Sequence, residues 1–106
     1  VMNKNKHIRV WFNIGTGRGT ALSIALKCSR QYVNKISKPS VGISDSAWNS
    51  ISYAMQIVEL DEMRSIKKIE QNILKSAHLS HSKDNEIKML AQAELDKWIE
   101  LLGATA

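Results

Sequence analysis

The sequence contains few cysteine, proline, glycine and aromatic residues. Among 106 residues there are one Cys, one Pro and five Gly, and Phe, Trp and Tyr together make up 6%. The single thiol, Cys28, has no intrachain disulfide partner and is typical of a small buried residue in a reducing compartment. So few prolines and glycines argue against disorder and against a turn-rich β fold. No run approaches the roughly 18 apolar residues of a membrane span, and the start lacks the apolar segment of a secretory signal. We therefore expect a small all-α protein that is soluble, cytoplasmic and without a membrane partner.

Acidic residues are absent from the first 44 positions, which nevertheless contain eight basic residues. From Asp45 onward there are seven basic and ten acidic residues, so a charge of +8 is followed by one of −3, for a net +5. A surface without carboxylates suits an approach to duplex DNA, which presents a phosphate about every 1.7 Å along its axis. The asymmetry predicts that the first half of the chain contacts nucleic acid.

Apolar residues recur at helical spacing along most of the chain. This spacing predicts helices at about 4–14, 20–27, 29–37, 44–60 and 83–102, with Ser29 and Ser44 as N-caps and Gly103 ending the last helix. Between them, the register of the apolar residues shifts near 59–61, which indicates either a bend there or one long helix. The polar stretch 77–82 is predicted to be a connection.

The predicted helices 20–27 and 29–37 are separated by only a few residues around Cys28, as in a helix-turn-helix. The second helix carries Arg30, Gln31 and Asn34 on its outer face. Arginine can bond guanine through two parallel hydrogen bonds, while Asn and Gln pair with the adenine edge. These residues are therefore candidate base readers, although a polar face of this kind is also the usual solvated side of a surface helix.

The segment resembles the small Cro-like helix-turn-helix regulators of phages and prophages, of the YdaS type. The resemblance is carried by Trp11-Phe12-Asn13, Gly17-Arg18-Gly19, Ala21-Leu22, Ala25-Leu26, Ser29-Arg30-Gln31-Tyr32-Val33-Asn34-Lys35-Ile36 and Ile43-Ser44. It implies a lambda repressor-like four-helix head over 1–58, with a recognition helix at 29–37 in the major groove. It also implies core positions at Leu22, Leu26, Val33 and Ile36. One departure is Lys27, which stands where the turn usually has glycine, so that either its backbone is strained or the turn differs.

These inferences give one set of expected DNA contacts. The expected base-reading residues are Arg30, Gln31, Asn34 and Lys35, and the expected phosphate contacts are Arg18, Thr20, Ser29, Tyr32 and Lys38. The loop 38–42 departs from the sequence common in the resembled regulators, which bears on the contact expected of Lys38. The expected function is a transcriptional regulator, by default a repressor, that occupies operator DNA.

The remaining residues, 59–106, carry two apolar stripes. One stripe comprises Met63, Ile66, Ile69, Ile73 and Leu74, and the other Ile87, Leu90, Leu95 and Trp98. They can pack on each other within the chain or bury against a second copy, and we favour a homodimer because two recognition helices would then read an inverted repeat. Alternatives are an antitoxin-type protein that holds a protein partner through its C-terminal helices, and an accessory oligomer for DNA packaging or replication.

Other functional patterns are weak. The stretch 15–19 is glycine-rich but lacks the Gly-Lys-Ser/Thr ending of a phosphate-binding loop, and His78 and His81 have no third ligand for zinc. The carboxylates Asp61 and Glu62 fall on a predicted solvated stretch, and each tryptophan lies on an apolar stripe that favours core packing. We therefore expect no enzymatic activity, no cofactor and no metal.

Overall fold

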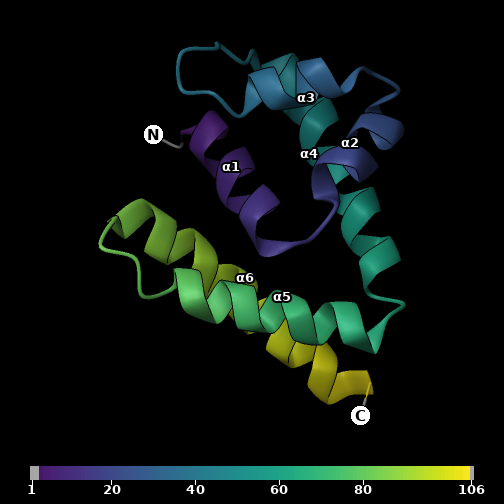
Figure 1. Cartoon of the computed structure of the whole chain (residues 1–106), viewed down its shortest axis with the longest axis vertical. Helices are drawn as coiled ribbons and strands as arrows, with labels where there is room; N and C mark the ends of the chain where they lie inside the picture. Colours follow the sequence, from purple (N-terminus) through teal and green to yellow (C-terminus); the bar gives the residue numbers. More distant parts are fainter. Residues whose placement is uncertain (1–2, 106) are drawn as a thin grey trace.

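A computed structural model of the chain describes residues 3–105 and contains six helices and no strand within that range (Figure 1). The helices are α1 (Lys4–Ile14), α2 (Arg18–Leu26), α3 (Arg30–Ile36), α4 (Asp45–Glu62), α5 (Ile66–Leu79) and α6 (Asn85–Thr105). The prediction of an all-α fold is confirmed. Residues 1, 2 and 106, at the outer ends of the predicted segments 1–58 and 59–106, lie outside the described residues.

Five helices begin after a side chain that caps a backbone N–H three residues further on. The capping residues are Asn3, Ser29, Ser44, Ser65 and Asp84. Each accepts a hydrogen bond from a backbone N–H of the first turn, which has no acceptor within the helix. The predicted caps at Ser29 and Ser44 are thereby confirmed.

Three predicted boundaries differ from the structure. The break after α4 lies at 63–65 rather than 59–61. Glu59 and Glu62, in the last turn of α4, are buried and bonded to Lys97 and Arg18, contacts that the spacing of apolar residues could not indicate. Residues 77–79 stay within α5. The helix α6 continues through Gly103 to Thr105, so the predicted stop at Gly103 is wrong. A glycine costs a helix only about 1 kcal/mol relative to alanine, and the φ of Gly103 is not positive.

The main core lies among the first four helices. Its buried members are Ile8, Trp11, Leu22, Val33, Ile36, Ile51, Ala54, Met55 and Val58. Leu26 and Trp48 pack against this cluster while partly exposed, and Trp98 is buried on α6. The core positions predicted for Leu22, Val33 and Ile36 are confirmed.

Helices α5 and α6 pack along each other and against α1, below the other helices in the view of Figure 1. The centres of both predicted apolar stripes are used in this packing, since Ile69 and Trp98 are fully buried. Ile66 and Leu74 remain exposed. Intrachain packing therefore accounts for part of the apolar surface that the sequence analysis favoured for a dimer.

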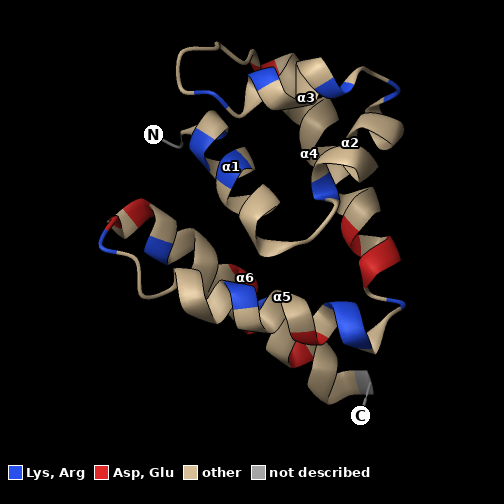
Figure 2. Ribbon diagram, viewed as in Figure 1, with Lys and Arg blue, Asp and Glu red and all other residues tan. Residues whose placement is uncertain are grey.

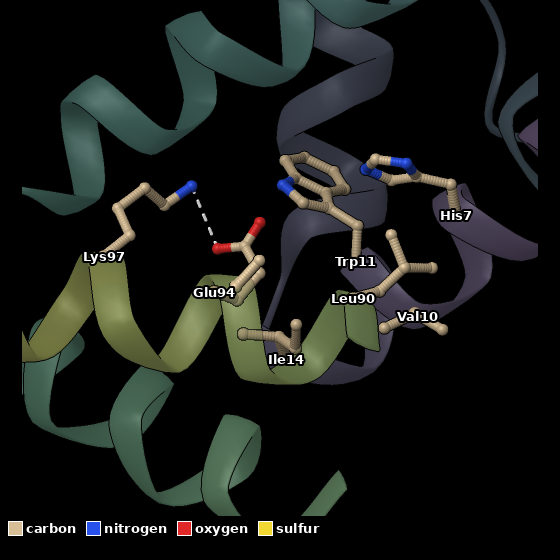
Figure 3. Close-up of a pocket in the computed structure, with 8 residues that line it drawn as sticks. His7, Val10, Trp11, Ile14, Leu90, Glu94 and Lys97 are labelled. Atoms are coloured by element: carbon tan, nitrogen blue, oxygen red, sulfur yellow. Dashed lines mark ion pairs between the residues drawn. The ribbon is translucent and has the colours of Figure 1, made fainter. Parts of the chain in front are cut away.

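A hollow separates α1 from α6 and has polar groups on one wall. Figure 3 shows Trp11 and Ile14 of α1 beside Leu90, Glu94 and Lys97 of α6. Glu94 accepts a hydrogen bond from the indole N–H of Trp98 at 2.8 Å and forms an ion pair with Lys97 at 2.9 Å. Burial lowers the pKa of His7 in the same hollow. The hollow is thus lined by residues from both predicted segments, 1–58 and 59–106.

Candidate nucleic-acid interface

The turn between α2 and α3 is tight and uses an unusual backbone conformation. Lys27 has φ 55° and ψ 45°, and it is the one non-glycine residue among those described with a positive φ. Its N–H donates to the carbonyl of Ile24 at 3.1 Å, and the N–H of Cys28 donates to that of Ser23 at 3.0 Å. Both bonds close the C-terminus of α2, as a left-handed residue does at many helix ends. Lys27 thus takes the conformation that glycine usually supplies.

Helix α3 divides sharply into a buried and an exposed side. Val33 and Ile36 are buried in the core, whereas the predicted base readers Arg30, Gln31, Asn34 and Lys35 are all exposed. Within residues 3–105, the side chains of Gln31, Asn34 and Lys35 form no hydrogen bond or ion pair. Their donors and acceptors are therefore open to a partner molecule.

Arg30 differs from its neighbours because its guanidinium has a partner within the chain. It donates to the hydroxyl of Thr20 in the first turn of α2. A Cβ at Gly19 would lie 3.2 Å from the guanidinium carbon, so the arginine lies close against this turn. Gly17, the N-cap of α2, offers no side-chain acceptor to the first N–H groups. The cation, the hydroxyl and the helix N-terminus together make a setting that suits an anion.

The other predicted phosphate contacts lie beside α3. Ser29 accepts from the N–H of Tyr32 at 3.2 Å, which leaves its hydroxyl proton available for donation. Tyr32 is 41% exposed, and Lys38 lies exposed in the loop after α3.

Arg18 does not belong to this surface, and its predicted phosphate contact is wrong. The residue is 1% exposed, and its guanidinium donates to both oxygens of Glu62, the shortest distance being 2.7 Å. It also donates to the carbonyl of Trp11 at 3.0 Å. Glu62, predicted to be solvated, is 5% exposed and accepts a further bond from Asn72.

The inward turn of Arg18 depends on a nearby glycine. A Cβ at Gly15 would lie 2.0 Å from Nε of Arg18, so only glycine leaves room for this path. The partner Glu62 is 44 positions away in the sequence. No local pattern signals such a pairing, so it could not be predicted from the sequence alone.

Ion pairs neutralise three of the eight basic residues in the first 44 positions. Lys4 pairs with Asp45 at 2.7 Å, Lys6 pairs with Asp84 and Glu86, and Arg18 pairs with Glu62. Bonds from these lysines also lower the pKa of Asp45 and of Asp84.

The basic residues without such a pair gather around α3. Lys27, Arg30, Lys35 and Lys38 have no carboxylate partner in the described part of the chain, and Arg9 on α1 is the fifth unpaired residue of this set. Figure 2 shows Lys and Arg on α3 and on the segments flanking it, and also on α1 and α5, with Asp and Glu mainly on the end of α4 and on α6. Within the first 44 positions, the unpaired positive charge is therefore concentrated next to the predicted DNA contacts.

Other kinds of site find little support in residues 3–105. No group of three or more His, Cys, Asp and Glu side chains is placed to hold a metal ion. No helix among these residues is both long and apolar enough to cross a membrane. Comparison of the chain with family models, curated proteins and solved structures finds no match.

Proposed function

We propose that this protein is a sequence-specific DNA-binding regulator that inserts α3 into the major groove. The observation that carries the proposal is the helix-turn-helix geometry of α2 and α3, in which α3 buries Val33 and Ile36 and exposes a polar face surrounded by unpaired cations. By resemblance, the regulator is of the phage and prophage Cro-like kind with a lambda repressor-like head. Occupation of an operator, and hence repression, is the simplest action for a protein of this size.

The exposed side chains of α3 divide into two roles. Gln31, Asn34 and Lys35 have open donors and acceptors and are assigned to base edges. Arg30 is assigned instead to a backbone phosphate, since its bond to Thr20 holds it against the first turn of α2. This revises the base contact that the sequence alone suggested for Arg30. Ser29, Tyr32 and Lys38 complete the phosphate contacts.

Selection of random duplexes by the purified protein at physiological salt tests the proposal. An enriched sequence is expected, and Asn34→Ala should relax base preference at one position of it, at a cost of about 1–3 kcal/mol in binding. Lys38→Ala and Arg30→Ala should weaken enriched and scrambled duplexes alike. Lys83→Ala, an exposed cation in the turn between α5 and α6, is the control and should change neither.

Two outcomes would contradict the proposal. Binding without any enriched sequence, abolished by moderate salt, would show a protein that only grips phosphates. Equal losses on both duplexes for Asn34→Ala and Lys38→Ala would remove α3 from base recognition. A loss confined to the enriched sequence for Arg30→Ala would return that residue to base reading.

A further inference from the structure

Helices α2 and α4 expose four large apolar side chains to solvent. Ile24 is 71% exposed, Tyr53 62%, Ile57 44% and Leu60 61%. The three α4 residues are spaced by four and by three positions, which places them on one stripe of the helix. We call this surface, with Ile24 and the stripe of α4, the α2–α4 face.

The α2–α4 face has hollows as well as projections. One hollow lies between the two helices at Ala21, Ile24, Ile57 and Val58, and a second lies at Leu26, Ser50, Tyr53 and Ala54. Ile57 and Ala25 border both hollows. Exposed apolar side chains and hollows therefore lie together on one surface, as an interlocking contact between helices requires.

The charges at the rim of the α2–α4 face are of both signs. Asp61 and Lys68 line the same hollow, and neither forms an ion pair within residues 3–105. In an isologous contact the same surface of both copies meets across a two-fold axis. Asp61 of one copy can then pair with Lys68 of the other, and the reverse. A partner whose surface carries charges of only one sign would repel either Asp61 or Lys68.

The C-terminal helices lack a comparable stripe. Their exposed large apolar residues are Ile66 and Leu74 on α5, and Met89 and Ile99 on α6. At 3.6 residues per turn, the two members of each pair are turned by about 80° from each other around the helix axis. These side chains do not form one continuous face on either helix.

We propose that the α2–α4 face joins two copies of this chain in an isologous dimer. None of the residues lining its two hollows belongs to α3, so both recognition helices stay open to DNA. A two-fold axis that runs along the face leaves both copies of α3 at the same end of the dimer. That this dimer reads an inverted repeat rests on the proposed function, whereas the contact between the two α2–α4 faces does not.

The solution mass of the full chain tests the interface. Wild type should have about twice the 11.9 kDa of one copy, whereas Ile57→Asp should raise the dissociation constant of the dimer at least tenfold and give single-copy mass. Met89→Asp, which alters an exposed α6 residue, is the matched control and should remain dimeric. Circular dichroism would verify that each variant is folded, and Ile24→Asp, at a more exposed site, replaces Ile57→Asp if that variant unfolds.

A charge exchange tests the same contact without altering its apolar part. Asp61→Lys should weaken the dimer, and adding Lys68→Asp should restore it. A wild type of single-copy mass, or an unchanged mass for both Ile57→Asp and Ile24→Asp, would overturn the proposal. Dissociation by Met89→Asp with a dimeric Ile57→Asp would place the interface on the C-terminal helices instead.

The outcomes separate this inference from the proposed function. A single-copy Ile57→Asp variant that still prefers one half of the enriched sequence would support both. Mass changes as expected, with no enriched sequence for the wild type, would leave the dimer standing and refute sequence-specific binding.

Discussion

Replacing Glu62 by alanine tests whether the buried ion pair holds α2 to the C-terminal part of the protein. Glu62 at the end of α4 receives three guanidinium bonds from Arg18 at 2.7–3.2 Å and one from Asn72 of α5 at 3.1 Å. The Arg18 guanidinium carbon also lies 4.6 Å from the centre of the Trp11 ring. The variant would leave a fully buried cation without its counterion.

The expected loss is large because Arg18 has no route to solvent. Removing one partner of a buried pair costs about 3–5 kcal/mol, a large part of the roughly 5–15 kcal/mol that stabilises a domain. A loss of 3 kcal/mol corresponds to a fall of roughly 12–24 °C in melting temperature at this size. Replacing both partners, Arg18→Met with Glu62→Leu, should cost much less, since neither charge is then buried.

Urea unfolding followed by circular dichroism measures these differences. Glu70→Ala removes an exposed carboxylate of α5 and serves as the control, with an expected change within about 0.5 kcal/mol. A Glu62→Ala variant as stable as the control would refute the reasoning, as would a double variant that is less stable than Glu62→Ala. The folded double variant should also bind DNA as the wild type does, because Arg18 is absent from the proposed interface.

Three further predictions concern stability and are measured by the same unfolding assay. Gly15→Ala should be destabilising because its Cβ would collide with Arg18, and a wild-type midpoint would show that Arg18 takes another path. Lys27→Gly should raise stability by up to about 1 kcal/mol because glycine adopts a positive φ without steric cost, and a loss of stability would contradict this account. Burial lowers the pKa of His7 below its ordinary 6.5. The neutral imidazole therefore contributes to the stability of the folded state above pH 6.5, and this contribution is lost as the pH falls towards the pKa of the folded state. His7→Phe should therefore flatten the change in stability between about pH 7.5 and about pH 5.5, and an unchanged slope would refute the role of His7.

Local features of the fold could be predicted from the sequence alone. The helix 4–14, the caps at Ser29 and Ser44, and the inward side of α3 all agree with the structure. These features depend on residues within one or two helical turns, so neighbouring side chains and the spacing of apolar residues suffice. The strained turn at Lys27 was one of two open alternatives, and the structure decided it.

Charge neutralisation depended on tertiary structure. Counting residues indicated a strongly basic first half, yet Lys4, Lys6 and Arg18 each meet a carboxylate from Asp45 or beyond. Of the basic residues in the first 44 positions that stay unpaired, all but Arg9 on α1 lie on α3 or on the segments that flank it. A pattern read along the chain contains no information on which distant carboxylate folds back onto which cation.

Composition and helical periodicity by themselves determined that this protein is all-α and which side of α3 faces the core. Only the tertiary structure decided that Arg18 is buried, that α4 extends to Glu62 and that Ile24 and Ile57 stay on the surface. The physical reason is distance along the chain. Helix formation is decided by neighbours a few residues apart, whereas the burial of a charge or an apolar side chain depends on groups more than 40 positions away, such as Glu62 for Arg18.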